Sequence, residues 1–185
     1  MKRLKLFLSF IAGLSSALNA QMYTAKSGST NITFFSEAPL ENIEAVNKGA
    51  VVVLRSSTSD LQIRVTIQNF KFKNALMEEH FNENYMESEK FPYCEYKGRI
   101  NEPVDYTKDG EYKVTLTGKL TLHGVTRDVM NNGTLTKAGN EIKLSSKFKI
   151  KVADYNIKVP SMYVKNIAEE VEVTFISTLE PYKKN

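Results

Sequence analysis

The sequence predicts an all-β protein whose antiparallel strands close into a barrel. In the segment 112–122, apolar residues and one glycine alternate strictly with lysine and threonine. Such alternation is typical of a long strand that has one dry face and one solvated face. Segments 61–68 and 142–152 alternate in the same way, and short turn signals separate the predicted strands. Strands joined by short turns pair with their sequence neighbours, which predicts an antiparallel sheet.

Residues 1–20 are predicted to be a secretory signal peptide and not part of the fold. Three basic residues precede a short apolar segment, and small residues up to Ala20 offer a cleavage site. No cysteine lies directly after the apolar segment, which excludes a lipidated N-terminus. Cleavage after Ala20 leaves a single domain over residues 21–185, long enough to bury a sizeable core. We therefore expect a periplasmic or secreted protein.

Charge and cysteine content narrow the function classes. The chain has a formal net charge of +4, and removal of the three basic signal residues reduces it to +1. A nearly neutral domain without a clustered basic face does not fit nucleic acid binding. Cys94 is the only cysteine, so no intramolecular disulfide forms, and we expect its thiol to be buried as a small hydrophobe.

The predicted strands follow one another along the chain. Ile32 and Phe34 come after a turn signal at residues 27–29, and a His123-Gly124 step predicts a turn after the longest strand. The remaining strand-like segments are 51–54, 61–68, 112–122, 142–152 and 171–179.

The β pattern is broken between residues 74 and 89. Met77, Phe81 and Tyr85 are spaced by four residues, while the glutamates of this segment point elsewhere. This period predicts an amphipathic helix over about 74–89. Its apolar stripe either docks the helix onto the barrel or forms a lid over the barrel mouth, and the two roles are compatible. A second, shorter helical turn is predicted at 161–166, after Pro160.

Lysines decide which face of the barrel points inward. Four of them share one face of the segment 142–152, at positions 143, 147, 149 and 151. In a membrane barrel the apolar face points outward. These lysines would then lie in a narrow lumen without matching carboxylates on neighbouring strands, which is too costly. The apolar face is therefore predicted to line the interior, and no stable membrane insertion is expected.

Several motifs, in this order and spacing, resemble the YceI-like family. The segment Leu120–Val129, with the sequence LTLHGVTRDV, is the most specific. The helix segment with the following Lys90-Phe91-Pro92, and the run Phe148–Ile157, resemble other landmarks of that family. The resemblance covers nearly the whole chain after the signal. It implies an exported, eight-stranded lipocalin-like barrel that binds a long isoprenoid or related lipid, with no established catalytic residue.

The candidate ligand-binding residues are those on the predicted inner faces and on the helix. They are Phe34, Ile63, Val65, Met77, Phe81, Leu116, Gly118, Leu120, Phe148, Ile150, Val173 and Phe175. Gly118 has two interpretations, a gap in the cavity wall or a bend of the strand at a barrel corner. No cofactor is expected.

The two histidines do not predict a catalytic or metal site. His80 with Glu83 and Glu87 matches no established ligand pattern. His123 lies beside a glycine turn and has Asp128 close in sequence. A ring hydrogen bond to the backbone around that turn is favoured over an acid–base role, because nothing nearby supplies a nucleophile.

Three functions remain open at this point. A barrel of about eight strands is either filled by its own side chains or holds one small ligand. A continuous dry cavity favours a lipid-binding carrier or sink, and a convergent polar cluster in that cavity favours an enzyme acting on lipids. A lumen packed by side chains favours a partner-binding or stress-related module. Homodimerisation is left open.

Overall fold

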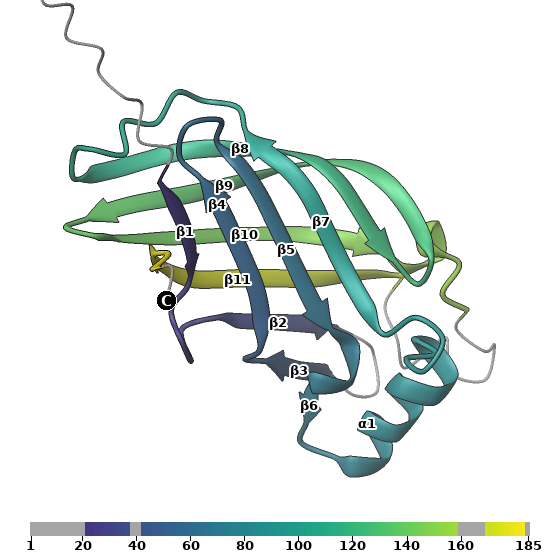
Figure 1. The fold of residues 1–185 in the computed structure, drawn as a ribbon. Helices are drawn as coiled ribbons and strands as arrows, with labels where there is room; N and C mark the ends of the chain where they lie inside the picture. Colours follow the sequence, from purple (N-terminus) through teal and green to yellow (C-terminus); the bar gives the residue numbers. More distant parts are fainter. Residues whose placement is uncertain (1–20, 38–41, 159–168, 184–185) are drawn as a thin grey trace, which may run out of the picture.

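The computed structural model describes residues 21–37, 42–158 and 169–183, so the predicted signal peptide and the predicted turn at 161–166 lie outside the described residues. Within them, eleven strands form one antiparallel sheet that curves into a barrel (Figure 1). The strands are β1 (Met22–Ala25), β2 (Asn31–Ser36), β3 (Ile43–Asn47), β4 (Ala50–Arg55), β5 (Asp60–Thr66), β6 (Lys71–Phe72), β7 (Tyr93–Ile100), β8 (Gly110–Leu122), β9 (Val125–Ala138), β10 (Glu141–Lys151) and β11 (Glu170–Pro181).

The barrel closes because β1 is paired on both sides. Tyr23 lies opposite Leu54 of β4 on one side and opposite Pro181 of β11 on the other. The closed ring runs β1-β4-β5-β7-β8-β9-β10-β11, which confirms the predicted eight-stranded antiparallel barrel. Strands β2, β3 and β6 extend the wall at one end, where β2 pairs with the first half of β11.

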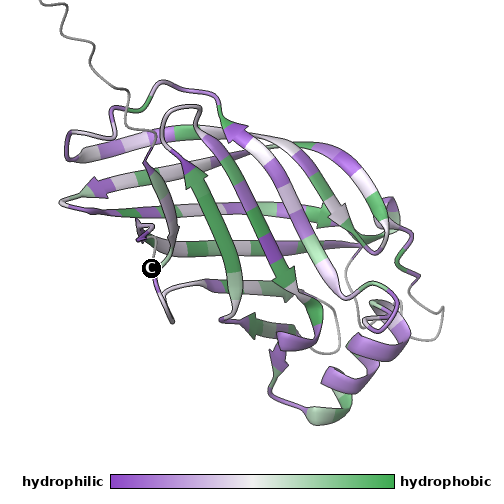
Figure 2. Ribbon diagram, in the orientation of Figure 1, coloured by the Kyte–Doolittle hydropathy of each residue, from purple (hydrophilic) through white to green (hydrophobic). Residues whose placement is uncertain are grey.

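Period-two alternation builds the long strands, as the sequence predicts. Along β8, Val114, Leu116, Leu120 and Leu122 are buried, while Lys113 and Lys119 of the same strand are exposed. Figure 2 shows the same alternation of hydrophobic and hydrophilic residues along the long strands. β8 and β9 meet in a two-residue turn at His123-Gly124, with φ of 49° and 74°. Positive φ at both positions is typical of the type I′ hairpin, whose twist matches that of the strands.

The lysines of β10 point away from the barrel interior, as predicted. Lys147 Nζ lies 2.8 Å from Glu172 Oε1, and Lys149 Nζ lies 3.6 Å from Glu170 Oε2 on the neighbouring β11. The premise that no matching carboxylates exist is therefore wrong, because the glutamates of β11 alternate in step with these lysines. The orientation of β10 and β11 follows instead from the apolar residues on the other face of both strands, which pack into the barrel interior.

The helix is shorter than predicted. Helix α1 spans Ala75–His80 and continues as a π-helical segment, η2, over Phe81–Tyr85. It begins at Asn74, whose side-chain oxygen accepts from the Leu76 N–H at 2.9 Å. The expected last turn to residue 89 does not form, because Glu87 has a φ of 42° and the Ser88 N–H donates back to Asn82 O at 2.8 Å. This bond pairs a carbonyl at the helix end that would otherwise lack a partner.

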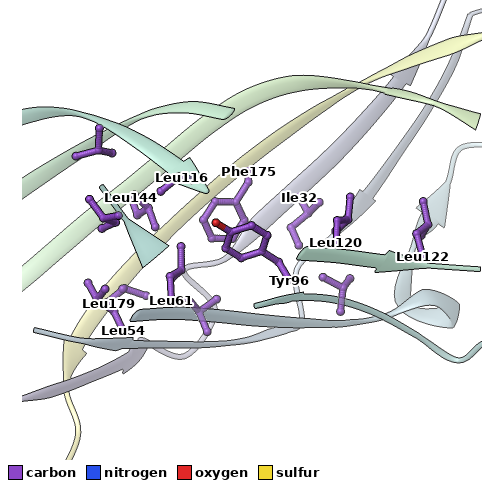
Figure 3. Close-up of a cluster of buried hydrophobic side chains, with 14 of the residues drawn as sticks. Ile32, Leu54, Leu61, Tyr96, Leu116, Leu120, Leu122, Leu144, Phe175 and Leu179 are labelled. Carbon is purple, nitrogen blue, oxygen red and sulfur yellow. The ribbon is translucent and has the colours of Figure 1, made fainter. Parts of the chain in front are cut away.

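One end of the barrel is filled by the chain's own side chains. Five leucines from five strands have no exposed surface there, namely Leu54, Leu61, Leu135, Leu144 and Leu179. Figure 3 shows Leu54, Leu61, Leu144 and Leu179 gathered at one end of the apolar cluster. We refer to these five leucines as the plug. Because the plug occupies this end, the interior is closed on the side away from α1.

β9 and β10 are paired over only part of their length. Their ladder runs from Ala138 opposite Glu141 to Gly133 opposite Ser146. At this last pair, Ser146 Oγ donates to Asn132 O at 2.7 Å. In the described chain, residues 125–132 of β9 then pair with β8 alone, and residues 147–151 of β10 pair with β11 alone. The wall therefore opens between β9 and β10 on the side toward α1.

Candidate ligand-binding cavity

A cavity of about 400 Å³ occupies the barrel between the plug and α1. Its wall comes from β2, β5, β7, β8, β9, β10 and β11, and α1 and η2 contribute to its mouth. Most of the lining side chains are aliphatic or aromatic. The lumen is therefore not filled by the protein's own side chains.

All the residues predicted to bind ligand line this cavity, with the exception of Gly118. Val65, Leu116, Leu120 and Phe175 are almost fully buried, and the others are half-buried because part of their surface faces the cavity. Within each strand these residues are spaced by even numbers, which places them on the same inner surface of the barrel. That they bind a ligand stays a prediction.

Gly118 does not form a gap in the cavity wall. It lies opposite Gly98 of β7, and a Cβ added to Gly118 would lie 2.5 Å from both Gly98 Cα and Lys97 O. This distance is too short for any side chain, so the two glycines allow β7 and β8 to approach closely. The interpretation as a gap is wrong, because the backbone of the partner strand occupies the space.

An aromatic cluster fixes the helix at the cavity mouth. The Phe81 ring of η2 lies 5.4 Å from the ring of Phe34 in β2, 5.7 Å from that of Phe70 and 5.0 Å from that of Phe72 in β6. Ring pairs at these distances contribute beyond the area that they bury. Met77, Phe81 and Tyr85 also line the cavity, so one stripe both docks the helix and covers the mouth.

Sequence analysis missed several lining residues, of which Tyr96 is the largest. It lies on β7 between Cys94 and Gly98, and it is 9% exposed. The register Val65–Cys94 and Ile63–Tyr96 places its side chain on the inner face. The alternation in the segment 94–98 is the signal that could have identified it. Asn131 was missed because a polar residue does not mark an inner face, and Ser146 was not named as a ligand-binding residue although the alternation places it on the apolar face.

The Tyr96 hydroxyl is buried and has no hydrogen-bond partner among the described residues. The ring lies along β7, so that a Cβ on Gly98 would overlap Tyr96 Oη. Figure 3 shows the ring among Ile32, Leu116, Leu120 and Phe175. Burial raises the pKa of this phenol to about 12, because an apolar surrounding disfavours the phenolate. The hydroxyl therefore remains a neutral donor.

Cys94 belongs to the cavity wall. Burial raises the pKa of its thiol to about 12, and the neighbouring Glu95 carboxylate adds to the rise. Since the thiolate is the nucleophilic form, this cysteine is inert at neutral pH. Its half-buried state is consistent with the predicted burial as a small hydrophobe, and the rest of its surface lines the cavity.

A second, smaller pocket of about 150 Å³ lies where β9 and β10 separate. It shares Leu120, Val129, Asn131, Phe148 and Ile150 with the main cavity. Its outer rim carries Arg127, whose Nε donates to Asp154 O at 2.7 Å in the 3-10 helix η3 (Val152–Tyr155). The cavity thus approaches the surface at this seam as well as at the α1 mouth.

His123 does not bond the backbone around its own turn. Its Nδ1 lies 3.1 Å from Tyr155 O, and its Nε2 lies 2.9 Å from Glu87 Oε2. The ring is buried against Phe91 at a centroid distance of 4.5 Å. The predicted structural role is thus retained with different partners. Among the described residues, no group of three or more histidine, cysteine or acidic side chains could hold a metal ion.

A family model for the YceI-like domain matches residues 23–179, which run from β1 to β11. The chain belongs to the YceI-like family. Its most specific motif, Leu120–Val129, forms the end of β8, the His123-Gly124 turn and the start of β9 in this YceI-like barrel. A search of curated proteins finds no match.

Solved structures share the fold of this YceI-like chain. A polyisoprenoid binding domain from Saccharophagus degradans, implicated in plant cell wall breakdown, has a TM-score of 0.74 at 15% identity, covering 86% of this chain and 98% of that one. BcnA from Burkholderia cenocepacia has a TM-score of 0.70 at 16% identity, covering 83% and 98%. The YceI protein of Campylobacter jejuni reaches 0.57 at 18% identity, covering 74% and 81%. None of the helices in the described part of the chain has the length and apolar character needed to cross a membrane.

Proposed function

We propose that this YceI-like protein is an exported carrier or sink that holds one long apolar chain of the polyisoprenoid type inside its barrel. The observation that carries the proposal is the open cavity of about 400 Å³ with a nearly continuous apolar wall. Its volume falls within the usual range for small-molecule sites. Between its two ends the wall offers dispersion contacts and almost no hydrogen bonds, which suits a hydrocarbon chain.

The neighbouring structures support the same class of ligand. The domain from Saccharophagus degradans with the same fold is described as polyisoprenoid binding. Export is proposed from the predicted signal peptide at residues 1–20. N-terminal sequencing of the exported protein should begin near Gln21, and an intact Met1 on a cytoplasmic protein would contradict export.

The cavity favours binding over the two alternatives. A partner-binding module with a filled lumen does not fit an open interior. A lipid enzyme would need an activated nucleophile or an acid–base pair in the cavity. Cys94 lines the wall, but its thiol has a pKa of about 12 and stays protonated.

Lipid extraction followed by mass spectrometry tests the proposal directly. Protein purified under native conditions should release a long-chain lipid in stoichiometric amount. Recovery of no lipid, together with failure of the delipidated protein to take up a polyprenol, a quinone or a fatty acid, would refute it.

Filling the cavity provides the matched mutational test. Leu120→Trp and Phe148→Trp enlarge side chains that point into the cavity. Each should reduce lipid uptake while the β-sheet circular dichroism remains, at a stability cost of about 1–3 kcal/mol from overpacking. Met130→Trp is the control, because Met130 lies on β9 with 72% of its surface exposed. Equal uptake by all three variants would place the ligand outside the barrel.

A further inference from the structure

We propose that the inner end of the cavity is a polar subsite, centred on Tyr96 Oη and the Asn131 side chain, that receives an uncharged oxygen-bearing end group of the lipid. This inference rests on the proposed lipid-binding function and adds which class of lipid the cavity selects and in which direction the lipid lies.

The inner end is defined by the last lining residue of each strand before the plug. Leu116 lines the cavity and Val114 does not, and Phe175 lines it while Ser177 does not. By the same criterion, the inner end comprises Ile32, Ile63, Tyr96, Leu116, Asn131, Ser146 and Phe175. Three of these seven side chains carry polar groups.

The polar groups come from one continuous part of the wall. Tyr96, Leu116 and Asn131 lie on the adjacent strands β7, β8 and β9, and Leu116 is directly opposite Asn131. Ser146 follows on β10, in the last residue pair of the β9–β10 ladder. The rest of the wall at this depth is apolar and consists of Ile32, Ile63 and Phe175. The subsite is therefore one-sided.

The hydrogen-bonding capacity of these groups is largely unused. Tyr96 Oη is buried without any partner, and the Asn131 amide makes no hydrogen bond in the described part of the chain. Ser146 Oγ donates to Asn132 O, which leaves its lone pairs available as acceptors. A buried hydroxyl without a partner is destabilising, and a ligand oxygen that accepts from Tyr96 would remove this cost.

The charge of the lining selects an uncharged group. No lysine or arginine is among the described residues that line the main cavity. A carboxylate or phosphate at the inner end would be buried without a cation, which is strongly unfavourable. An alcohol or carbonyl oxygen can accept from Tyr96, and an alcohol can also donate to Asn131 or Ser146. The lipid is thus expected to lie with its oxygen end inward and its chain toward α1.

Competition binding with ligands of equal chain length tests the subsite. Delipidated wild-type protein is loaded with the hydrocarbon probe diphenylhexatriene, which is displaced by hexadecane, hexadecanol or hexadecanoate at neutral pH. Hexadecanol should displace the probe at about fivefold lower concentration than hexadecane, as expected for one net hydrogen bond. Hexadecanoate should bind more weakly than hexadecanol.

Tyr96→Phe keeps the ring and removes only the hydroxyl. It should abolish the preference for hexadecanol over hexadecane, and Asn131→Leu should reduce the same preference. Tyr23→Phe is the control, because Tyr23 is also buried but lies outside the cavity. Equal binding of hexadecane and hexadecanol by the wild type, or stronger binding of hexadecanoate, overturns the polar subsite while lipid binding stands. If none of the three ligands displaces the probe from the wild-type protein, both proposals fail.

Discussion

Nε2 of His123 lies 2.9 Å from Oε2 of Glu87, and this contact joins the β8–β9 turn to the segment that follows η2. Nδ1 of the same ring lies 3.1 Å from the carbonyl oxygen of Tyr155 in η3. Since a carbonyl oxygen only accepts, Nδ1 carries a proton. One imidazole therefore fastens three chain segments around the cavity mouth.

Replacement of His123 should loosen this junction. His123→Asn keeps a residue type that tolerates the φ of 49° but is too short to reach both partners. We expect a loss of about 2–3 kcal/mol in the free energy of unfolding, from two lost hydrogen bonds and an underpacked site. Urea denaturation measures it. His80→Asn is the control, since no hydrogen bond or ion pair involves that side chain in the described part of the chain, and equal stability of the two variants would contradict the junction.

Gly118→Ala should destabilise the barrel more than the small size of the added methyl group suggests. The added Cβ would lie 2.5 Å from the backbone atoms Gly98 Cα and Lys97 O, which cannot rotate away. We expect a loss of at least about 1–3 kcal/mol, the range typical of overpacked sites. Gly110→Ala provides the comparison, because its Cβ would meet only the Tyr112 ring at 3.6 Å or more and its φ is ordinary. Thermal melts that shift equally for both variants would show that β7 and β8 can move apart.

Phe81→Ala should open the mouth of the cavity without unfolding the barrel. The substitution removes ring contacts with Phe34, Phe70 and Phe72, so α1 and η2 lose their main attachment. Bound lipid should then dissociate faster, and limited proteolysis should cut within residues 75–85. Glu79→Ala, on the exposed side of α1, is the matched control. Unchanged dissociation and unchanged proteolysis would show that the helix does not cover the mouth.

Alkaline pH should destabilise the fold through two cavity residues. Burial raises the pKa of Cys94 from 9.0 and that of Tyr96 from 10.0, each to about 12. The folded state then holds these protons more tightly than the unfolded state, so the stabilisation is complete below pH 9 and is lost as the pH rises toward 12. Urea midpoints measured over this range should fall.

The double variant Cys94→Ala/Tyr96→Phe isolates this contribution. Its urea midpoint should fall less steeply than that of the wild type over the same pH range. Some decrease should remain, because burial also raises the pKa of Tyr23, Tyr106 and Tyr155. Identical slopes for the variant and the wild type would show that neither cavity residue titrates differently in the folded state.

The strands and the cavity wall could be predicted from the sequence because they depend only on the alternation of inward-facing and outward-facing residues along each strand. Once Leu116 is assigned to the inner face, Leu120 follows, and the same holds for Phe148 with Ile150. The inner facing of Asn131 could not be predicted, since it requires the register that places it opposite Leu116. The role of Gly118 likewise depends on a glycine in another strand.

The helix end and the seam could not be predicted for a different reason. The turn at Glu87 depends on backbone geometry that no local residue pattern demands, since glutamate rarely adopts positive φ. The separation of β9 from β10 after Gly133 and Ser146 depends on how the whole sheet curves. Both are outcomes of packing between distant segments rather than of local propensity.

The pairing of β1 with β11 also determines when the protein can hold a ligand. β1 begins at Met22 and precedes the other strands of the ring in the chain, whereas β11 ends at Pro181 and follows them. During synthesis the sheet therefore remains an open ribbon with two unpaired edges. A pocket enclosed by a ring of strands does not exist until the final strand has joined. On the proposed function, a lipid can therefore be enclosed only after β11 has been synthesised and has paired with β1.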